Sequence, residues 1–225
     1  KIYAKNNYDL ILSGRNISND LKSFINNLKN KYDINISTLE LDILNFSTHK
    51  HLYESLEIKP NGVISFIGLT DIQLSEKSTI IDNNIIIDTN FSGIASFIDV
   101  LLEDFKNKKN NWIMAVTSIT ADRGTKKNKV YASSKRDFNK YLDTQRNKKG
   151  QQNIHITIVK LGLVNTAMIK RTNYPKFLVS EPDMVANSMF LAEQSKKKSV
   201  YIPSFWRLIM FILKLTPNPI YQKLF

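Results

Sequence analysis

The chain has 225 residues, of which 42% are hydrophobic and 23% charged, a composition that predicts a globular protein and excludes an intrinsically disordered one. It contains no cysteine, which excludes a disulfide framework and a thiolate metal site and is consistent with a reducing cytoplasm. The net charge of +12 has two interpretations. It indicates binding to an anionic partner such as nucleic acid or a membrane, or it reflects a biased genome composition, since Lys, Asn and Ile are abundant together. Because the lysines are scattered, the second interpretation is favoured for most of them, and no nucleic-acid motif occurs.

Apolar runs alternate with amphipathic segments along the chain. The opening KIYAKNNYDL has the pattern of a helix end that runs into a strand. Strands are expected at 9–13, 35–41, 62–68, 112–117 and 154–161. Helices are expected at 20–31, capped by Ser18 or Asn19, and from just after Asp42 to about residue 56. Two further helices are expected at 88–106 and at 131–146. This alternation predicts an α/β chain with a parallel sheet, one domain over residues 1–200 and a tail at 201–225.

The stretch 116–135, VTSITADRGTKKNKVYASSK, contains three residues with a joint chemical use. Tyr131 and Lys135 are one helical turn apart, so they share a helix face. An ammonium held near a phenol favours the phenolate and lowers its pKa from about 10. We therefore expect Lys135 to make Tyr131 a usable general acid or base, and Ser118, at a strand end, to hydrogen-bond the same substrate oxygen. The alternative is an ordinary exposed helix face.

The pattern Ser-x12-Tyr-x3-Lys, formed by Ser118, Tyr131 and Lys135, resembles the catalytic signature of the short-chain dehydrogenases/reductases. The order of strands and helices resembles that family from residue 1 to about residue 170. The resemblance implies a Rossmann-like, three-layer fold with a doubly wound parallel sheet. In such a sheet a dinucleotide lies at the carboxyl ends of the strands, where the other candidate residues fall.

Two candidates follow the first two predicted strands. Arg15 follows Gly14, which occupies the place where NAD-type family members have an acid, so the resemblance implies NADP(H) in preference to NAD(H). The alternative for Arg15 is a solvent-exposed turn residue. Asp42 resembles the family aspartate that contacts the adenine, and it is equally suited to cap a helix N-terminus.

Further candidates resemble family positions in later segments. Gly68 ends Ser-Phe-Ile-Gly where the family has Asn-Asn-Ala-Gly, so the glycine is kept and the asparagines are not. Asn90 resembles the mid-helix asparagine that holds a proton-relay water, although it is also explained as a tolerated polar residue. Gly162, Val164 and Thr166 resemble the family's Pro-Gly-x-Val-x-Thr, with Leu161 in place of the proline. The resemblance implies that the Val164 backbone contacts the nicotinamide carboxamide and that Thr166 contacts the carboxamide or a phosphate oxygen.

The family's glycine-rich turn, which cradles the pyrophosphate, does not occur, since no glycine precedes Gly14. We expect about 15–20 residues before Lys1, enough for the first strand and this turn, so the first strand and turn are missing from the chain as given.

The tail 201–225 combines apolar and basic residues, and positions 194–225 contain no acid. Its apolar run at 208–213 is too short to span a bilayer. A helix lying in a membrane interface, a subunit interface and a cover over the substrate pocket are the alternatives. The stretch 117–168, with its Ala-Asp-Arg-Gly at 121–124, together with the tail, resembles the decaprenylphosphoryl keto-pentose reductases of bacterial envelope polysaccharide synthesis, whose substrates are lipid-linked sugars.

Together these features predict an NADPH-dependent reductase of a small-molecule or lipid-linked ketone, located in the cytoplasm or at the inner face of the membrane. It is expected to form homo-oligomers through its long helices and to bind no metal, because His49, His51 and His155 show no ligand pattern. Lys170, Arg171 and Lys176 hint at an anionic substrate group. The alternatives are a non-catalytic membrane-associated module and a basic nucleic-acid binder.

Overall fold

A computed structural model describes residues 1–70, 80–124, 128–148, 153–169 and 174–224. The chain forms two compact units, Lys1–Pro60 and Asn61–Phe225. The helices of the tail at 201–225 belong to the second of these compact units. Each unit is described by itself.

The first unit is built around two parallel strands, β1 (Leu10–Gly14) and β2 (Ile36–Glu40), with Leu10 opposite Ile36. Three helices accompany them: α1 (Ile2–Lys5), α2 (Asn19–Lys31) and α3 (His49–Glu54), the last preceded by a 3-10 turn at Phe46–Thr48. Helix α2 begins where the sequence predicts, because Ser18 Oγ accepts a hydrogen bond from the Leu21 amide at 3.2 Å. The unit therefore has a strand–helix–strand order with its own small apolar core.

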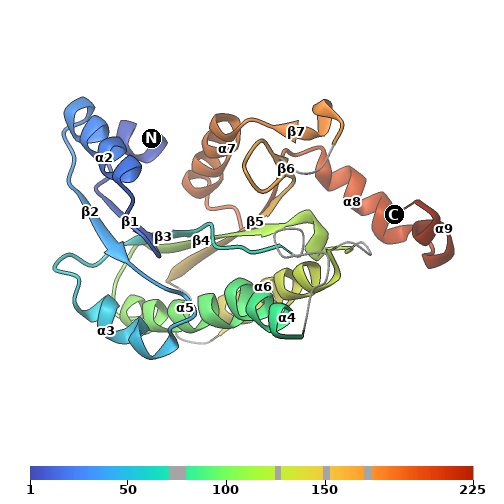
Figure 1. The fold of residues 1–225 in the computed structure, drawn as a ribbon, viewed down its shortest axis with the longest axis horizontal. Helices are drawn as coiled ribbons and strands as arrows, with labels where there is room; N and C mark the ends of the chain where they lie inside the picture. Colours follow the sequence, from blue (N-terminus) through green and yellow to red (C-terminus); the bar gives the residue numbers. More distant parts are fainter. Residues whose placement is uncertain (71–79, 125–127, 149–152, 170–173, 225) are drawn as a thin grey trace. The chain divides into compact units, whose positions relative to one another are not determined.

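The second unit contains a four-stranded parallel sheet in the order β3-β4-β5-β8 (Figure 1). Its strands are β3 (Gly62–Ser65), β4 (Asn111–Ser118), β5 (Ile154–Leu161) and β8 (Ser199–Ile202). Helices α5 (Gly93–Phe105) and α6 (Lys129–Asn147) cover one face, and α7 (Pro182–Gln194) covers the other (Figure 1). Helices on both faces of a parallel sheet confirm the predicted α/β, three-layer architecture.

The remaining elements connect these layers or follow them. They are α4 (Ile80–Ile87), the π-helical turn Asp88–Ser92, the 3-10 turns Ile119–Ala121 and Lys176–Leu178, the strand pair β6 (Leu163–Val164) and β7 (Val179–Ser180), and the helices α8 (Trp206–Leu215) and α9 (Asn218–Leu224). The predicted helix at 88–106 thus begins earlier, at Ile80. The segment Asn83–Phe105 is long and apolar enough to cross a membrane, but half of it is buried inside this unit, as expected of a core helix.

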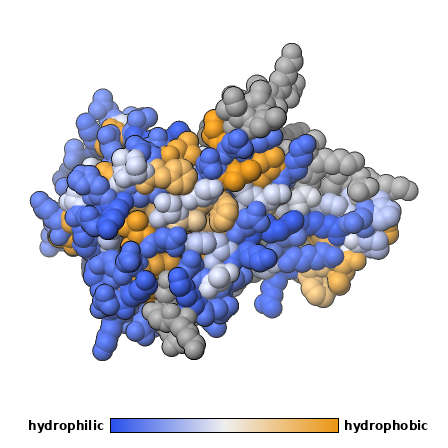
Figure 2. Space-filling view, turned by 90° about the horizontal axis from the view of Figure 1, so that it is seen from below, coloured by the Kyte–Doolittle hydropathy of each residue, from blue (hydrophilic) through white to orange (hydrophobic). Residues whose placement is uncertain are grey.

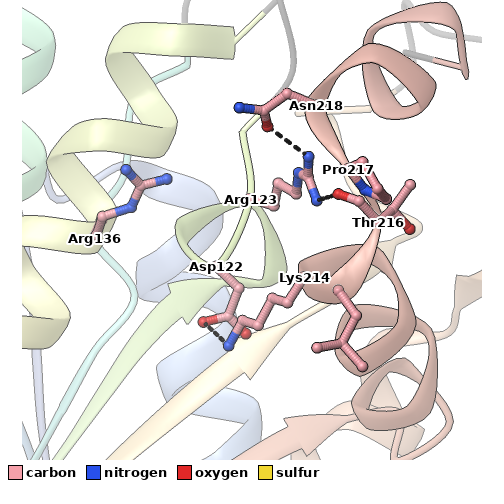
Figure 3. A pocket seen from close by; sticks show the side chains of 8 residues that line it. Asp122, Arg123, Arg136, Lys214, Thr216, Pro217 and Asn218 are labelled. Carbon is pink, nitrogen blue, oxygen red and sulfur yellow. Dashed lines mark hydrogen bonds and ion pairs between the residues drawn. The ribbon is translucent and has the colours of Figure 1, made fainter.

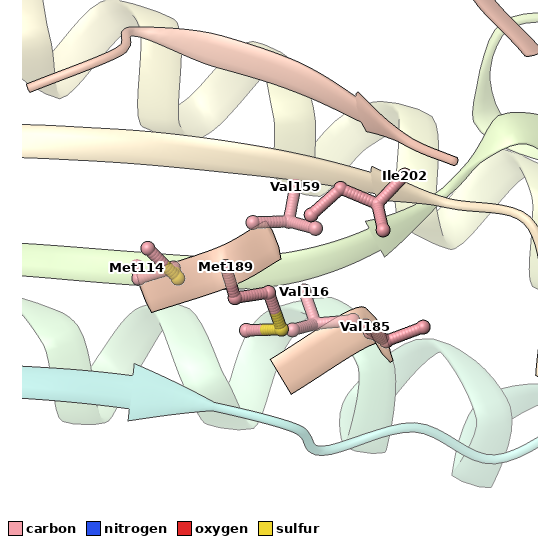
Figure 4. Packing of buried hydrophobic residues seen from close by; sticks show 6 residues of the cluster. All are labelled: Met114, Val116, Val159, Val185, Met189 and Ile202. Carbon is pink, nitrogen blue, oxygen red and sulfur yellow. The ribbon is translucent and has the colours of Figure 1, made fainter. Parts of the chain in front are cut away.

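The core of the second unit forms where α7 meets the sheet. Val185 and Met189 of α7 pack against Met114 and Val116 of β4 and Val159 of β5 (Figure 4). Six consecutive residues of β4, from Ile113 to Ser118, are buried, because this strand lies inside the sheet with helices on both faces. The buried strand β4 ends at Ser118, which is the first residue of the candidate site.

Candidate active site

Ser118 and Tyr131 are brought together at the carboxyl end of β4. Ser118 is the last residue of β4, and Tyr131 lies in the first turn of α6. Ser118 Oγ accepts hydrogen bonds from the Thr120 amide at 3.1 Å and the Thr120 hydroxyl at 2.9 Å. With both accepting positions used, its own proton is available for Tyr131, to which it is hydrogen-bonded.

The Tyr131 phenol is held in its protonated form. Burial raises the pKa of Tyr131, and the Ser118 hydrogen bond, which favours the phenolate, only partly opposes this. The prediction that Lys135 brings the pKa of Tyr131 below its ordinary value is therefore wrong for the protein alone. The physical reason is that burial disfavours the charged phenolate more strongly than the neighbouring groups stabilise it.

Lys135 is a buried amine with main-chain partners. Its side chain is only 2% exposed, and Nζ donates to the carbonyl oxygens of Ile67 at 2.7 Å and Val116 at 3.4 Å. Burial lowers the pKa of Lys135 to about 7. The amine therefore connects the end of β3, the end of β4 and α6, and it titrates in the neutral range instead of being permanently charged.

Asn90 holds the segment after β3 against the helices. It lies in the π-helical turn and is fully buried. Its Oδ1 accepts from the Leu69 amide at 2.7 Å, and its Nδ2 donates to the Leu69 carbonyl at 2.8 Å and to Ser134 Oγ at 3.1 Å. Ser134, which the sequence did not single out, donates in turn to the Tyr131 carbonyl at 2.8 Å. The predicted water-relay role of Asn90 stays a prediction, whereas its role in joining these segments is visible.

The predicted glycine loops lie at the neighbouring strand ends. A Cβ at Gly68 would lie 3.4 Å from Lys135 Nζ and 3.7 Å from Asn90 Oδ1, so this glycine leaves the backbone open beside both polar groups. Gly162, Val164 and Thr166 follow β5, and Thr166 is exposed, with its hydroxyl bonded to the Val164 carbonyl at 3.3 Å. These positions lie in the same unit as Ser118 and Tyr131.

Arg15 and Asp42 belong to the first unit. Arg15 is exposed directly after β1, as predicted for a residue at a strand end. The alternative for Asp42, a helix cap, does not hold: its Oδ1 accepts from the Leu44 amide at 3.0 Å, and the next helical turn begins only at Phe46. The carboxylate closes a local turn of the chain, which is a common alternative use of aspartate. Contacts of either residue with adenosine stay predictions.

Asp122, which follows β4 and the 3-10 turn after it, is the centre of a charged network (Figure 3). Sequence reasoning missed this network. Asp122 accepts from Lys160 Nζ at 2.6 Å, from the Tyr201 hydroxyl and from Lys214 Nζ at 3.1 Å. Burial acts to raise the pKa of Asp122, but the Lys160 and Tyr201 hydrogen bonds outweigh it and hold the pKa below its ordinary value. The signal in the sequence was the Ala-Asp-Arg-Gly segment, which was interpreted only as a family resemblance.

Arg123 connects the same segment to the C-terminal helices (Figure 3). Its guanidinium lies 3.9 Å from the centre of the Tyr221 ring, and the Tyr221 hydroxyl donates to the Gly124 carbonyl at 3.1 Å. The guanidinium also donates to acceptors at and after the end of α8: the carbonyls of Leu213 and Thr216 and Oδ1 of Asn218. Carbonyls at a helix C-terminus have no intrahelical partner, so Arg123 serves as a side-chain cap for α8. An open surface depression of about 560 Å³ lies beside this contact.

Of the residues expected to face an anionic substrate group, Lys176 is exposed in the 3-10 turn before β7. Lys170 and Arg171 lie outside the described residues. Within the described parts of the chain, no cluster of three His, Asp or Glu side chains is arranged to hold a metal ion.

Comparison with known proteins identifies the family of the chain. The model of the short chain dehydrogenase family matches residues 1–176, and the chain therefore belongs to the short-chain dehydrogenase family. A curated relative, an uncharacterized oxidoreductase of Myxococcus xanthus (strain DK1622), is 23% identical over 140 residues, which are 61% of this chain and 54% of the relative. The chain thus spans about half the length of the curated relative it matches.

Solved structures share the fold at low identity. A short-chain dehydrogenase from Sphingobium yanoikuyae in complex with NADPH has a TM-score of 0.79 and 13% identity, over 96% of this chain and 90% of that chain. An alcohol dehydrogenase from the archaeon Thermococcus sibiricus, complexed with 5-hydroxy-NADP, has a TM-score of 0.73 and 16% identity, over 88% and 87%. Other similar structures hold NADP or NAD.

Proposed function

We propose that the protein is an NADPH-dependent oxidoreductase that reduces a ketone to a secondary alcohol, or catalyses the reverse reaction. The observation that carries the proposal is the hydrogen-bonded pair of Ser118 and Tyr131 with the buried Lys135 one turn further along α6. A hydroxyl donor and a protonated phenol at one strand end are suited to bind and protonate a carbonyl oxygen.

The residues present fit the nicotinamide half of a dinucleotide. Gly68 leaves open backbone next to Lys135 and Asn90, and the loop Gly162–Thr166 lies after the adjacent strand β5. The hydride for the reduction comes from the reduced nicotinamide. Lys135 would hold the nicotinamide ribose, and Val164 and Thr166 the carboxamide.

Tyr131 is the proposed proton donor. Its raised pKa keeps it protonated at neutral pH, so it is an acid that gives up its proton when negative charge develops on the carbonyl oxygen. Ser118 has one proton to donate, and its hydrogen bond to Tyr131 stabilises the resulting phenolate. A charged Lys135, one helical turn from Tyr131 on α6, would lower the free energy of this step, and the Lys135 pKa of about 7 makes its charge dependent on pH.

We infer a preference for NADP(H) over NAD(H) from Arg15 and Gly14 at the end of β1. A guanidinium there can bind a 2′-phosphate, and no acid stands at Gly14 to accept a bond from a 2′-hydroxyl. Several structures of similar fold hold NADP or NADPH, which supports the preference. The Asp42 turn would contact the adenine.

The proposed substrate is a small or lipid-linked ketone, with a lipid-linked sugar of cell-envelope synthesis as the particular candidate. The tail and the Asp-Arg pair at Asp122 and Arg123 support this, since they resemble the keto-pentose reductases and place basic and apolar residues in the second unit. We also propose that the protein is a homo-oligomer and that it acts in the cytoplasm, at the inner face of the membrane.

The test is the substitution Tyr131→Phe. Oxidation of NADPH in the presence of a panel of ketones is expected to fall at least about 1000-fold, while NADPH affinity changes little. Tyr141→Phe is the matched control: it removes a hydroxyl from the same helix, where the oxygen donates to Asp99 Oδ1 at 2.7 Å, and it should retain activity. Full turnover by the Tyr131→Phe variant would refute the mechanism, and failure of the full-length protein to bind NADPH would favour a non-catalytic module.

A further inference from the structure

Helix α8 has an inner face that belongs to the body of the second unit. Trp206 and Met210 are buried, at 8% and 3% exposure, and pack with Ile119, which follows the catalytic Ser118. Arg123 caps the C-terminal end of the helix, and Lys214 is tied to Asp122. The helix is therefore held in a defined orientation.

The outer face of α8 is also apolar. Four side chains spaced i, i+3, i+4 and i+7 form a stripe on one side of the helix, which we call the outer stripe: Leu208, Phe211, Ile212 and Leu215. They are 65%, 60%, 55% and 68% exposed. Figure 2 shows hydrophobic atoms exposed beside hydrophilic ones on the side where Figure 1 draws α8. A stripe with this spacing normally faces a core, and no described residue of this chain covers it.

The charge around the outer stripe has one sign. Residues 195–225 contain six basic side chains and no acidic one. Two of the six, Arg207 and Lys214, lie on α8 itself and are exposed. Apolar side chains flanked by cations, with Phe205 next to the helix start and 40% exposed, form the surface that an interfacial helix presents to anionic lipid.

We propose that the outer stripe of α8 docks on an anionic lipid membrane, with the helix lying in the plane of the interface. Its ten residues extend about 15 Å, half of a hydrocarbon core, so the helix cannot span the bilayer. The apolar side chains enter the acyl boundary, and the exposed Arg207 of α8 contacts lipid phosphates.

Charge favours lipid over a second copy of the chain as the occupant. Two outer stripes placed face to face would bring the two copies of Arg207 together, and residues 195–225 offer no acid to pair with them. An anionic headgroup layer neutralises the same charges. Docking in this way would place the segment that carries Ser118 and Ile119 near the membrane, although the proposal does not depend on the redox chemistry.

The experiment is co-sedimentation of the full chain with phospholipid vesicles. We expect binding when about a third of the lipid is phosphatidylglycerol, weaker binding to pure phosphatidylcholine, and weakening by salt. The double substitution Phe211→Ser and Leu215→Ser should lower the partition coefficient at least about tenfold. Leu191→Ser is the matched control, because Leu191 is equally exposed, at 64%, on α7 and should change nothing.

A charge reversal provides a second variant that leaves the apolar packing intact. Arg207→Glu should reduce binding to the anionic vesicles at least about threefold, with far-ultraviolet circular dichroism and thermal unfolding unchanged. The proposal is overturned if the wild-type chain does not bind anionic vesicles. It is equally overturned if both α8 variants bind them as tightly as the wild type does. It is also overturned if light scattering shows a dimer that the double substitution dissociates in the absence of any vesicle binding.

Discussion

Lys135 shows how a residue with a predicted role acquires properties that its place in the sequence does not define. The Tyr131–Lys135 spacing predicts a shared helix face, and the structure confirms that both lie on α6. The protonation state of Lys135 depends instead on its removal from water between the ends of β3 and β4. That removal is a tertiary effect, so neither its lowered pKa nor the raised pKa of Tyr131 could be predicted from local spacing.

The first prediction at this scale concerns stability against pH. The folded-state pKa of Lys135 is about 7, below the ordinary value, so between about pH 7 and pH 10 the unfolded chain binds more protons than the folded one. Stability contributed by this group therefore rises as pH increases through that window. Lys135→Met should reduce the slope of unfolding free energy between about pH 7 and pH 9 by roughly 1 kcal/mol per pH unit.

The measurement is urea unfolding at several pH values, with Lys140→Met as the control on the same helix. Lys140 is exposed, and its removal should leave the slope unchanged. Equal slopes for the wild type and Lys135→Met would show that Lys135 is not buried as described.

At the scale of elements, the sequence predicted best where a regular pattern and a local cap coincide. Strand β5 has the predicted bounds, and α2 is capped by Ser18, one of the two caps predicted for it. The helix through Asn90 was predicted as one regular segment, yet it contains a π-helical turn in which Asn90 meets the Leu69 backbone. Such a turn is stabilised by contacts distant in sequence, which periodicity does not contain.

The tail illustrates the same limit. Its apolar run predicted a helix but left open what the helix contacts. The structure answers this for the inner face, since Trp206 packs near Ile119 and Arg123 caps the C-terminal end of α8. The acceptors of Arg123 are about ninety residues away in the chain, so no local motif could have predicted them.

A prediction follows for α8. Arg123→Ala removes the donors to the terminal carbonyls of α8 and the contact with the Tyr221 ring, so the last turn of α8 should open more often. Amide hydrogen exchange in α8 and α9 is expected to rise at least about tenfold, with no change in β4. Arg207→Ala, which removes an exposed arginine from the same helix, is the control, and unchanged exchange in the Arg123→Ala variant would contradict the capping role.

At the scale of the whole molecule, the class of fold followed from the alternation of strands and helices, whereas the division into units did not. The predicted single domain over 1–200 rested on the lack of a linker-like segment. By compactness the residues fall into two units: Lys1–Pro60 contains a two-stranded sheet, and Asn61–Phe225 contains a four-stranded sheet covered on both faces. A change of unit without a change in composition leaves no mark in the sequence.

This division predicts a hierarchy of local stability. Amides of β4 and β5, buried between two helical layers, should exchange slowest, by at least about 100-fold relative to those of β1 and β2, because a two-stranded sheet has marginal stability. Hydrogen exchange of the full chain, followed by peptide mass spectrometry, measures this. Equal protection of β1 and β4 would mean that the units open together.

The contact between Gly162 and Trp206 has an evolutionary consequence. A Cβ at Gly162 would lie 2.1 Å from Trp206 Nε1, so the indole occupies the space that any other residue at 162 would need. Gly162, which resembles a residue of the family's cofactor loop, is therefore also required for the packing of Trp206 in the tail. Positions 162 and 206 are expected to covary among homologues: where a smaller residue replaces the tryptophan, the glycine is free to change, and where the tryptophan is present, it is not.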